Sequence, residues 1–207
     1  MRPALRHIAR STALVIGVSL AVAAPVAARE PVDPNTLSPP PPASFNATCE
    51  RTGSGIVCDL AFSDPPLVSE PSAIICDGTE LLVSQTRDVV GKRFYDANGN
   101  LTRRHFREDF AGTLTNPTSG ITLDWVAHNT IIHNLAVPGD IASGQTTISG
   151  QQIRVFGANG TVLVDVGHLV VDEATGELLD SSGKHAFDDY FINGNTEALA
   201  PICNAIT

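Results

Sequence analysis

The stretch IRVFGANGTVLVDV, residues 153–166, indicates two antiparallel strands joined by a tight turn. Asn-Gly dipeptides such as Asn159-Gly160 favour two-residue hairpin loops, because both loop positions need positive φ angles. With this loop, aliphatic residues face one another across the two strands. Arg154 then faces Asp165, an opposite-charge pair worth about 0.2–1 kcal/mol. Strand alternation would place the apolar pairs on one face and the ion pair on the other.

The same pattern of strands and turns continues in both directions from this hairpin. Long strands in hairpin order predict an all-β antiparallel meander, closed or nearly closed into a barrel of about eight strands. A β-sandwich is the alternative, although its strands are usually shorter and more numerous. A helix is expected only in the tail, over residues 196–206. The expected strands lie near residues 45–50, 55–63, 73–84, 86–95, 101–115, 121–135, 146–157, 161–172 and 177–192.

The four cysteines predict two disulfides, because an even number in an exported chain is typical of a disulfide framework. Gly53-Ser54 suits a two-residue hairpin loop with glycine first. In that register Cys49 faces Cys58, and facing residues on paired strands lie within disulfide reach. The sequence therefore predicts an N-terminal hairpin closed by Cys49–Cys58. Cys76–Cys203 remains as the second pair and would tie the C-terminal tail to an early strand.

The N-terminus has the pattern of a secretory signal peptide over residues 1–28. Its first ten residues carry three arginines and no acid, and an uncharged apolar stretch follows over residues 12–24. Small residues at positions 26–28 then suit cleavage by a signal peptidase. A membrane anchor is the alternative, but a spanning helix needs about 20 apolar residues. We therefore expect a secreted, extracellular protein with no membrane span.

Cleavage would leave a proline-rich flexible spacer, residues 29–44, and a single β-rich domain, residues 45–207. Proline favours extended, solvated chain, which is why the spacer is expected. The cleaved chain has 10 basic and 22 acidic residues, so its formal charge is −12 with histidine neutral. An acidic surface of this kind repels nucleic acid and anionic membranes. Nucleic-acid binding is therefore excluded as a function class.

Residues 75–207 resemble a set of uncharacterised secreted bacterial proteins that are β-rich. The resemblance implies a β-rich fold, and the early and late cysteines of those proteins fit a Cys76–Cys203 bridge. No activity is attached to the group, so the resemblance implies no site. It rests on Cys76, Phe94-Tyr95-Asp96 with Asn98-Gly99, residues 112–117 with Gly120, Asp165-Val166-Gly167, Thr175-Gly176-Glu177-Leu178, and Cys203.

Four polar residues are candidates for a ligand-binding site: Arg104, Glu108, Gln151 and His168. Arg104 and Glu108 share a strand face with aromatic residues. His168 continues an alternating valine series, and the predicted hairpin register sets it opposite Gln151. Polar groups on an inward face need partners, because a bare buried charge is very costly. These four could line the polar end of a barrel cavity, or they could pair with one another or lie in water at strand ends.

No residue pattern predicts a metal ion, a cofactor or a catalytic group. His128 and His133 are five residues apart and point to opposite faces of a regular strand. His105 and Glu108, three apart, also point to opposite faces. We find no nucleophile motif, phosphate-binding glycine loop or dinucleotide fingerprint, although a triad can assemble from distant positions.

Three functions are compatible with these observations. The first is a secreted, non-enzymatic module that binds a small apolar or amphipathic molecule. The second is an extracellular structural or protein-interaction domain that recognises a protein partner through its acidic surface. The third is a hydrolase or isomerase, which would need two or more titratable groups converging in a cleft. The first is our hypothesis, by analogy with ligand-binding barrels.

Overall fold

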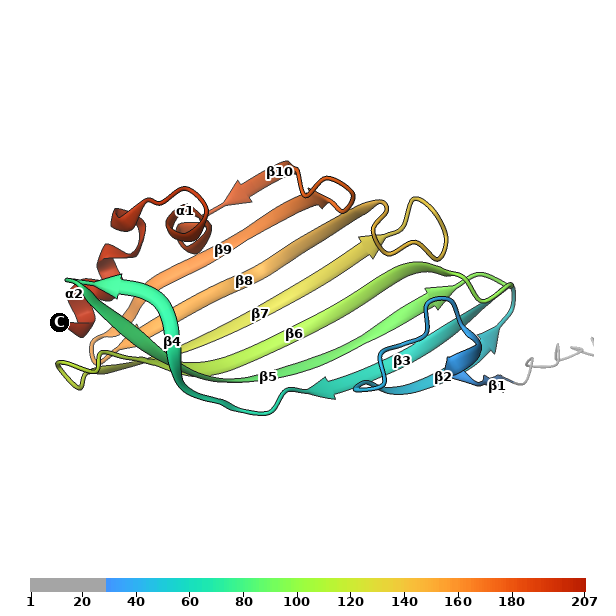
Figure 1. Cartoon of the computed structure of the whole chain (residues 1–207), viewed down its shortest axis with the longest axis horizontal. Coiled ribbons are helices and arrows are strands. Elements are labelled where there is room, and N and C mark those ends of the chain that lie inside the picture. Colours follow the sequence, from blue (N-terminus) through green and yellow to red (C-terminus); the bar gives the residue numbers. More distant parts are fainter. Residues whose placement is uncertain (1–28) are drawn as a thin grey trace, which may run out of the picture.

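The protein is built on one long, strongly curved antiparallel sheet (Figure 1). The computed structural model describes residues 29–207, so the signal peptide predicted over residues 1–28 lies outside the described residues. The strands are β1 (Glu30–Val32), β2 (Asn46–Thr52), β3 (Gly55–Ser63), β4 (Leu67–Cys76), β5 (Thr79–Tyr95), β6 (Leu101–Thr115), β7 (Thr122–Asn134), β8 (Gln145–Gly157), β9 (Gly160–Asp172) and β10 (Leu178–Gly183). The helical elements are η1 (Pro34–Thr36), α1 (Ala186–Phe191), η2 (Thr196–Leu199) and α2 (Ala200–Ile206). The prediction of an all-β antiparallel fold is confirmed.

The sheet is open, so the predicted barrel closure is wrong. Its strand order is β1-β2-β3-β5-β6-β7-β8-β9-β10, with β4 paired only to β5. The β-sandwich alternative is also not seen, because the described strands belong to one sheet. Closure would require a last strand long enough to pair with the first edge. β10 has only six residues, and the chain then turns into short helices that occupy the concave side of the sheet (Figure 1).

Two of the expected strands are divided or cut short in the structure. The strand expected over residues 73–84 is interrupted by a turn at Asp77-Gly78, where both residues have positive φ angles, 48° and 77°. Asp-Gly is a hairpin signal in its own right. β5 therefore runs for 17 residues and pairs first with β4 and then with β3. The strand expected over residues 177–192 ends at Gly183, and α1 follows it.

Around Asp165, the hairpin of β8 and β9 has a register one residue away from the predicted one. Its loop is Ala158-Asn159, and Ile153 is the residue that faces Asp165. A one-residue slip moves every side chain to the other face of a strand. Asp165 is consequently fully buried, whereas Val166 on the opposite face is 47% exposed. The predicted ion pair of Arg154 with Asp165 does not form, and Arg154 donates to Thr161 Oγ1 instead.

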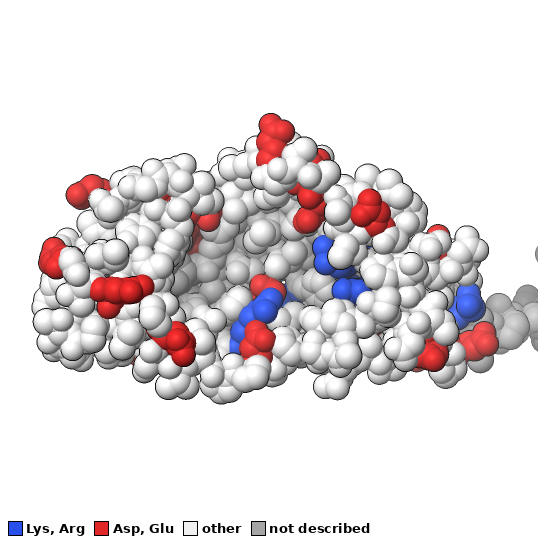
Figure 2. Space-filling view, viewed as in Figure 1, with Lys and Arg blue, Asp and Glu red and all other residues white. Residues whose placement is uncertain are grey.

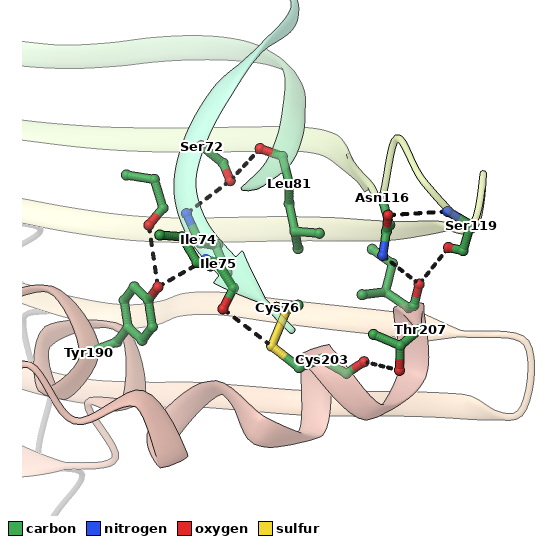
Figure 3. Close-up of a disulfide and its surroundings, with 12 residues drawn as sticks. Ser72, Ile74, Ile75, Cys76, Leu81, Asn116, Ser119, Tyr190, Cys203 and Thr207 are labelled. Atoms are coloured by element: carbon green, nitrogen blue, oxygen red, sulfur yellow. Dashed lines mark hydrogen bonds between the residues drawn. A yellow bond between two sulfur atoms is a disulfide. The ribbon is translucent and has the colours of Figure 1, made fainter. Parts of the chain in front are cut away.

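Both predicted disulfides are present. Cys49 faces Cys58 across β2 and β3 in the predicted register, with the loop at Gly53-Ser54. The second disulfide, Cys76–Cys203, joins the end of β4 to α2 (Figure 3). Two disulfides and no free cysteine in the described chain indicate an oxidising compartment.

The C-terminal tail is further held by hydrogen bonds around this disulfide (Figure 3). Asn116 Nδ2 and Ser119 Oγ donate to the carbonyl oxygen of Ile206 at 3.2 and 2.7 Å. The backbone N–H of Ile75 donates to the hydroxyl of Tyr190 at 2.9 Å. These bonds satisfy carbonyl and amide groups at the helix end and along β4, which would otherwise lack partners.

The proline-rich segment, expected as a flexible spacer, is packed against the sheet. β1 pairs with β2, and Leu37 is only 5% exposed. The carbonyl oxygens of Pro39 and Pro40 accept hydrogen bonds from Tyr95 Oη and Arg93 Nη1, each at 3.1 Å. Proline lacks an N–H group but keeps its carbonyl, so such a segment can be held through acceptors alone.

Two separate apolar cores cover the two ends of the concave face. One lies beneath the C-terminal helices and includes Leu81, Val155 and Ile202, each 0% exposed. The other lies beneath the proline-rich segment and includes Leu37 and Leu101. The middle of the concave face has neither cover. The architecture therefore leaves an open stretch of sheet between two packed ends.

Candidate functional site

The uncovered stretch forms a hollow of about 330 Å³ on the concave face. Figure 2 shows this depression in the middle of the molecule, with Lys and Arg atoms inside it and Asp and Glu side chains mostly around it. Its apolar lining consists of Phe45, Val89, Phe106, Ile131 and Ile148. Its polar lining consists of Arg87, Arg104, Glu108, His133, Thr146 and Glu173.

Cross-strand pairing explains why these side chains meet. Phe106 faces Ile131, which in turn faces Ile148, so one row across β6, β7 and β8 is apolar. The neighbouring row, two residues along each strand, runs from Arg104 to His133 and Thr146. Residues two apart lie on the same face of a strand. An apolar row thus lies directly beside a polar one.

The floor of the hollow contains a paired ion cluster. Arg87 Nη1 lies 3.1 Å from Asp64 Oδ2, and Arg87 Nη2 donates to Glu108 Oε1. The side chain of Glu108 is only 12% exposed. Burial lowers the pKa of Arg87, but hydrogen bonds and charge from Glu108 and Asp64 outweigh this and raise it. Arg87 is therefore paired with two carboxylates, Asp64 and Glu108.

Arg104 is held differently, by a neutral partner. Its Nε donates to His133 Nδ1 at 3.0 Å, and Nη2 contacts the same nitrogen. His133 is 1% exposed, and its Nε2 lies 2.8 Å from the carbonyl oxygen of Ser143. A carbonyl only accepts, so Nε2 carries the proton and Nδ1 accepts from Arg104. The histidine thus orients the guanidinium without cancelling its charge.

The structure brings together two of the four candidate ligand-binding residues. Arg104 and Glu108 both line the hollow. Gln151 faces Val166 and His168 faces Ser149 on the convex side, where His168 Nε2 lies 3.5 Å from Asp180 Oδ2. The slipped register of the hairpin reverses the face of His168, and the β-bulge between Gln151 and Ile153 reverses the face of Gln151.

The alternation predicted along β6 and β7 is confirmed. Phe106 and Glu108 point into the hollow, whereas His105 lies on the convex face. His128 is exposed on the convex face while His133 is buried beneath the hollow. Sequence reasoning missed His133, Arg87, Thr146 and Glu173 as lining residues. Their shared face depends on which strands are neighbours, and no local sequence signal reports that.

A second buried ionisable group lies beneath the C-terminal helices. Asp165 on β9 is 0% exposed, and its Oδ2 accepts the backbone N–H of Phe187 at 3.0 Å, which docks α1 on the sheet. Its Oδ1 has no hydrogen-bond partner among the described residues. Burial raises the pKa of Asp165, opposed in part by the Phe187 hydrogen bond and by His185.

We expect replacement of Asp165 by asparagine to stabilise the protein more at pH 7 than at about pH 4. The folded-state pKa of Asp165 lies above the unfolded value, so its contribution to stability is fully present below the unfolded pKa. That contribution is lost as the pH rises through the folded-state pKa. Urea unfolding of both proteins at the two pH values measures this difference. Asp124→Asn, at an exposed position, is the control. A gain in the free energy of unfolding from Asp165→Asn that does not increase with pH would contradict the raised pKa of Asp165.

Between residues 29 and 207, no group of three or more His, Cys, Asp or Glu side chains is arranged to hold a metal ion. No helix in the same range is long and apolar enough to cross a membrane. Comparison with protein-family models, with curated proteins and with solved structures finds no match to this chain.

Proposed function

We propose that this protein is a secreted, non-enzymatic module that binds a small apolar or amphipathic molecule in the hollow of its concave face. The observation that carries the proposal is the uncovered stretch between the two packed cores. It has five apolar side chains beside a polar row, and its volume of about 330 Å³ lies within the range of small-molecule sites. The oxidising compartment indicated by the disulfides is compatible with secretion.

The state of the titratable groups in the hollow favours binding over catalysis. Several of them converge, which is what an enzyme would need. However, Glu108 is engaged by Arg87, and both ring nitrogens of His133 are already bonded. The hydroxyl of Thr146 donates to Glu173. A general base must accept the substrate proton, and each of these groups is already held by a hydrogen-bonded partner within the protein.

Native mass spectrometry of the protein recovered from a secreting host tests the proposal. We expect extra mass in the native spectrum that disappears under denaturing, non-reducing conditions, because a ligand held without covalent bonds leaves when the sheet unfolds. The denaturing mass also locates the mature N-terminus. If the protein is recovered bare, uptake of the neutral apolar dye Nile red provides the second measurement.

A pair of variants ties the binding to the hollow. Ile131→Trp would place an indole in the hollow, and we expect at least about a tenfold loss of ligand or Nile red affinity. Ile132→Trp is the matched control. Ile132 is the next residue along β7, pairs with His105 on β6 and points with it to the convex face. Equal effects of the two substitutions, or no binding by the unmodified protein, would refute the proposal.

A protein-interaction domain is the second candidate, favoured by one specific surface. β10 is an edge strand on which every residue is exposed, including Leu178 and Leu179 at 54% and 44%. Phe191 and Ile192 nearby in the chain are also exposed. An exposed apolar edge is a common docking surface for another chain. Cross-linking that maps to this edge, from a protein without ligand, would favour this function.

A further inference from the structure

We propose that the molecule held in the hollow is an anionic amphiphile, a carboxylate-headed compound whose head group is bound by Arg104 and whose tail lies on the apolar row of Phe106, Ile131 and Ile148. This inference rests on the proposed function and specifies its ligand class. It depends on a difference between two arginines of the hollow. Arg104 bonds a neutral histidine, whereas Arg87 is paired with carboxylates.

Arg104 has a guanidinium with donors to spare. Of the five N–H donors of an arginine, the two that bond within the protein converge on the single acceptor His133 Nδ1. The other three have no partner among residues 29–207, and Nη1, which carries two of them, is not a buried atom. They therefore open onto the hollow that Arg104 lines. A planar guanidinium with free donors matches the two oxygens of a carboxylate.

The positive charge of Arg104 is not neutralised by a contact within the protein. In the described chain, no carboxylate oxygen lies within 4.0 Å of its guanidinium, in contrast to Arg87 with Asp64 and Glu108. Glu173, which also lines the hollow, attracts Arg104 electrostatically without forming an ion pair. Its carboxylate instead accepts from the hydroxyl of Thr146.

A second arginine adds to the positive field. Arg93 faces Arg104 directly across β5 and β6, is 6% exposed, and donates to the carbonyl oxygen of Pro40, with no ion pair to a carboxylate among the described residues. Burial lowers the pKa of Arg104, and the charge of Arg93 lowers it further. Two neighbouring, poorly solvated cations are costly unless an anion joins them. A bound carboxylate would supply that charge.

This positive site contrasts with the rest of the protein. Residues 29–207 carry 10 basic and 22 acidic residues, yet none of those carboxylates lies within 4.0 Å of Arg93 or Arg104, whereas Arg87 is paired with both Asp64 and Glu108. An acidic surface repels an anion from other parts of the protein, so the positive charge at Arg93 and Arg104 directs an anionic ligand to this site. The apolar row beside it accounts for the tail, because burying an apolar chain against apolar side chains is favourable.

Three compounds with twelve carbon atoms each test the head group: dodecanoate, 1-dodecanol and dodecylammonium. Their affinities are measured by displacement of Nile red from the disulfide-intact protein. We expect dodecanoate to bind at least about tenfold more tightly than 1-dodecanol, from the strength of charge-assisted hydrogen bonds, and dodecylammonium to bind most weakly. Equal or reversed affinities would overturn the head-group assignment but leave the proposed function standing. Failure of all three to bind would refute both.

Two substitutions locate the preference. Arg104→Met should abolish the advantage of dodecanoate over 1-dodecanol while keeping the affinity for 1-dodecanol. Arg103→Met is the matched control, because it removes the same charge from the preceding residue. Arg103 is exposed and stacks on Phe94 on the convex face. A preference that survives in Arg104→Met, or is lost equally in Arg103→Met, would overturn the assignment to Arg104. Should Arg104→Met fail to fold, the comparison of the three compounds in the unmodified protein still decides on the head group.

Discussion

Replacement of Cys76 and Cys203 by alanine is expected to lower the free energy of unfolding by about 5 kcal/mol. The two cysteines are 127 residues apart, so their disulfide closes a loop that spans most of the sheet. In the chain-entropy view, a crosslink stabilises mainly by restricting the unfolded chain, and the effect increases with loop length. Urea unfolding, followed by the fluorescence of the single tryptophan, Trp125, measures the loss.

The Cys49–Cys58 disulfide provides an internal control. Its cysteines are only nine residues apart, and the same relation predicts a loss of about 3 kcal/mol when both become alanine. The hairpin is also held by the seven-residue ladder of β2 with β3. A larger loss from this pair than from Cys76 and Cys203 would contradict the account, because the short loop restricts the unfolded chain less.

Replacement of Ile202 by alanine is expected to cost about 3 kcal/mol of stability, within the range for a large apolar residue in a core. Ile202 is 0% exposed and packs in the core between α2 and the concave face. Its truncation would leave a cavity that the disulfide-bound tail cannot move to fill. Equilibrium unfolding in urea gives the difference directly.

Ile192 supplies the comparison for this substitution. It follows α1 and is 76% exposed, so Ile192→Ala removes the same atoms without creating a cavity. We expect an effect within about 0.5 kcal/mol. Similar effects at the two positions would mean that the C-terminal helices are not firmly packed on the sheet. In that case the uncovered part of the concave face would extend beneath these helices, beyond the hollow.

The cover provided by these helices bears on the proposed binding function. The C-terminal helices and the proline-rich segment each pack on one end of the concave face, and both are held to the sheet by hydrogen bonds or a disulfide. Walls fixed in this way keep a site open before the ligand arrives. A preformed site loses less conformational entropy on binding.

Local sequence signals predicted much of the secondary structure. The glycine-first loop at Gly53-Ser54 set the register of β2 and β3 and therefore the Cys49–Cys58 disulfide. The Asn-Gly signal at residues 159–160 predicted a hairpin at the right place but in the wrong register, since the loop is Ala158-Asn159 and a bulge follows. A bulge adds one residue to one strand, and no turn motif reports it.

Composition and turn motifs thus determined that this protein is all-β, antiparallel and disulfide-bonded, because these properties depend on residues close together in the chain or on the redox environment. The open edge of the sheet, the packing of the proline-rich segment and the position of Asp165 depended on the tertiary structure. So did the hollow. Arg104 and His133 are 29 residues apart and meet only because β6 and β7 pair in one register. Which side chains share a face is decided by strand neighbours and bulges, and the free energy that selects them comes from burying both ends of the concave face at once.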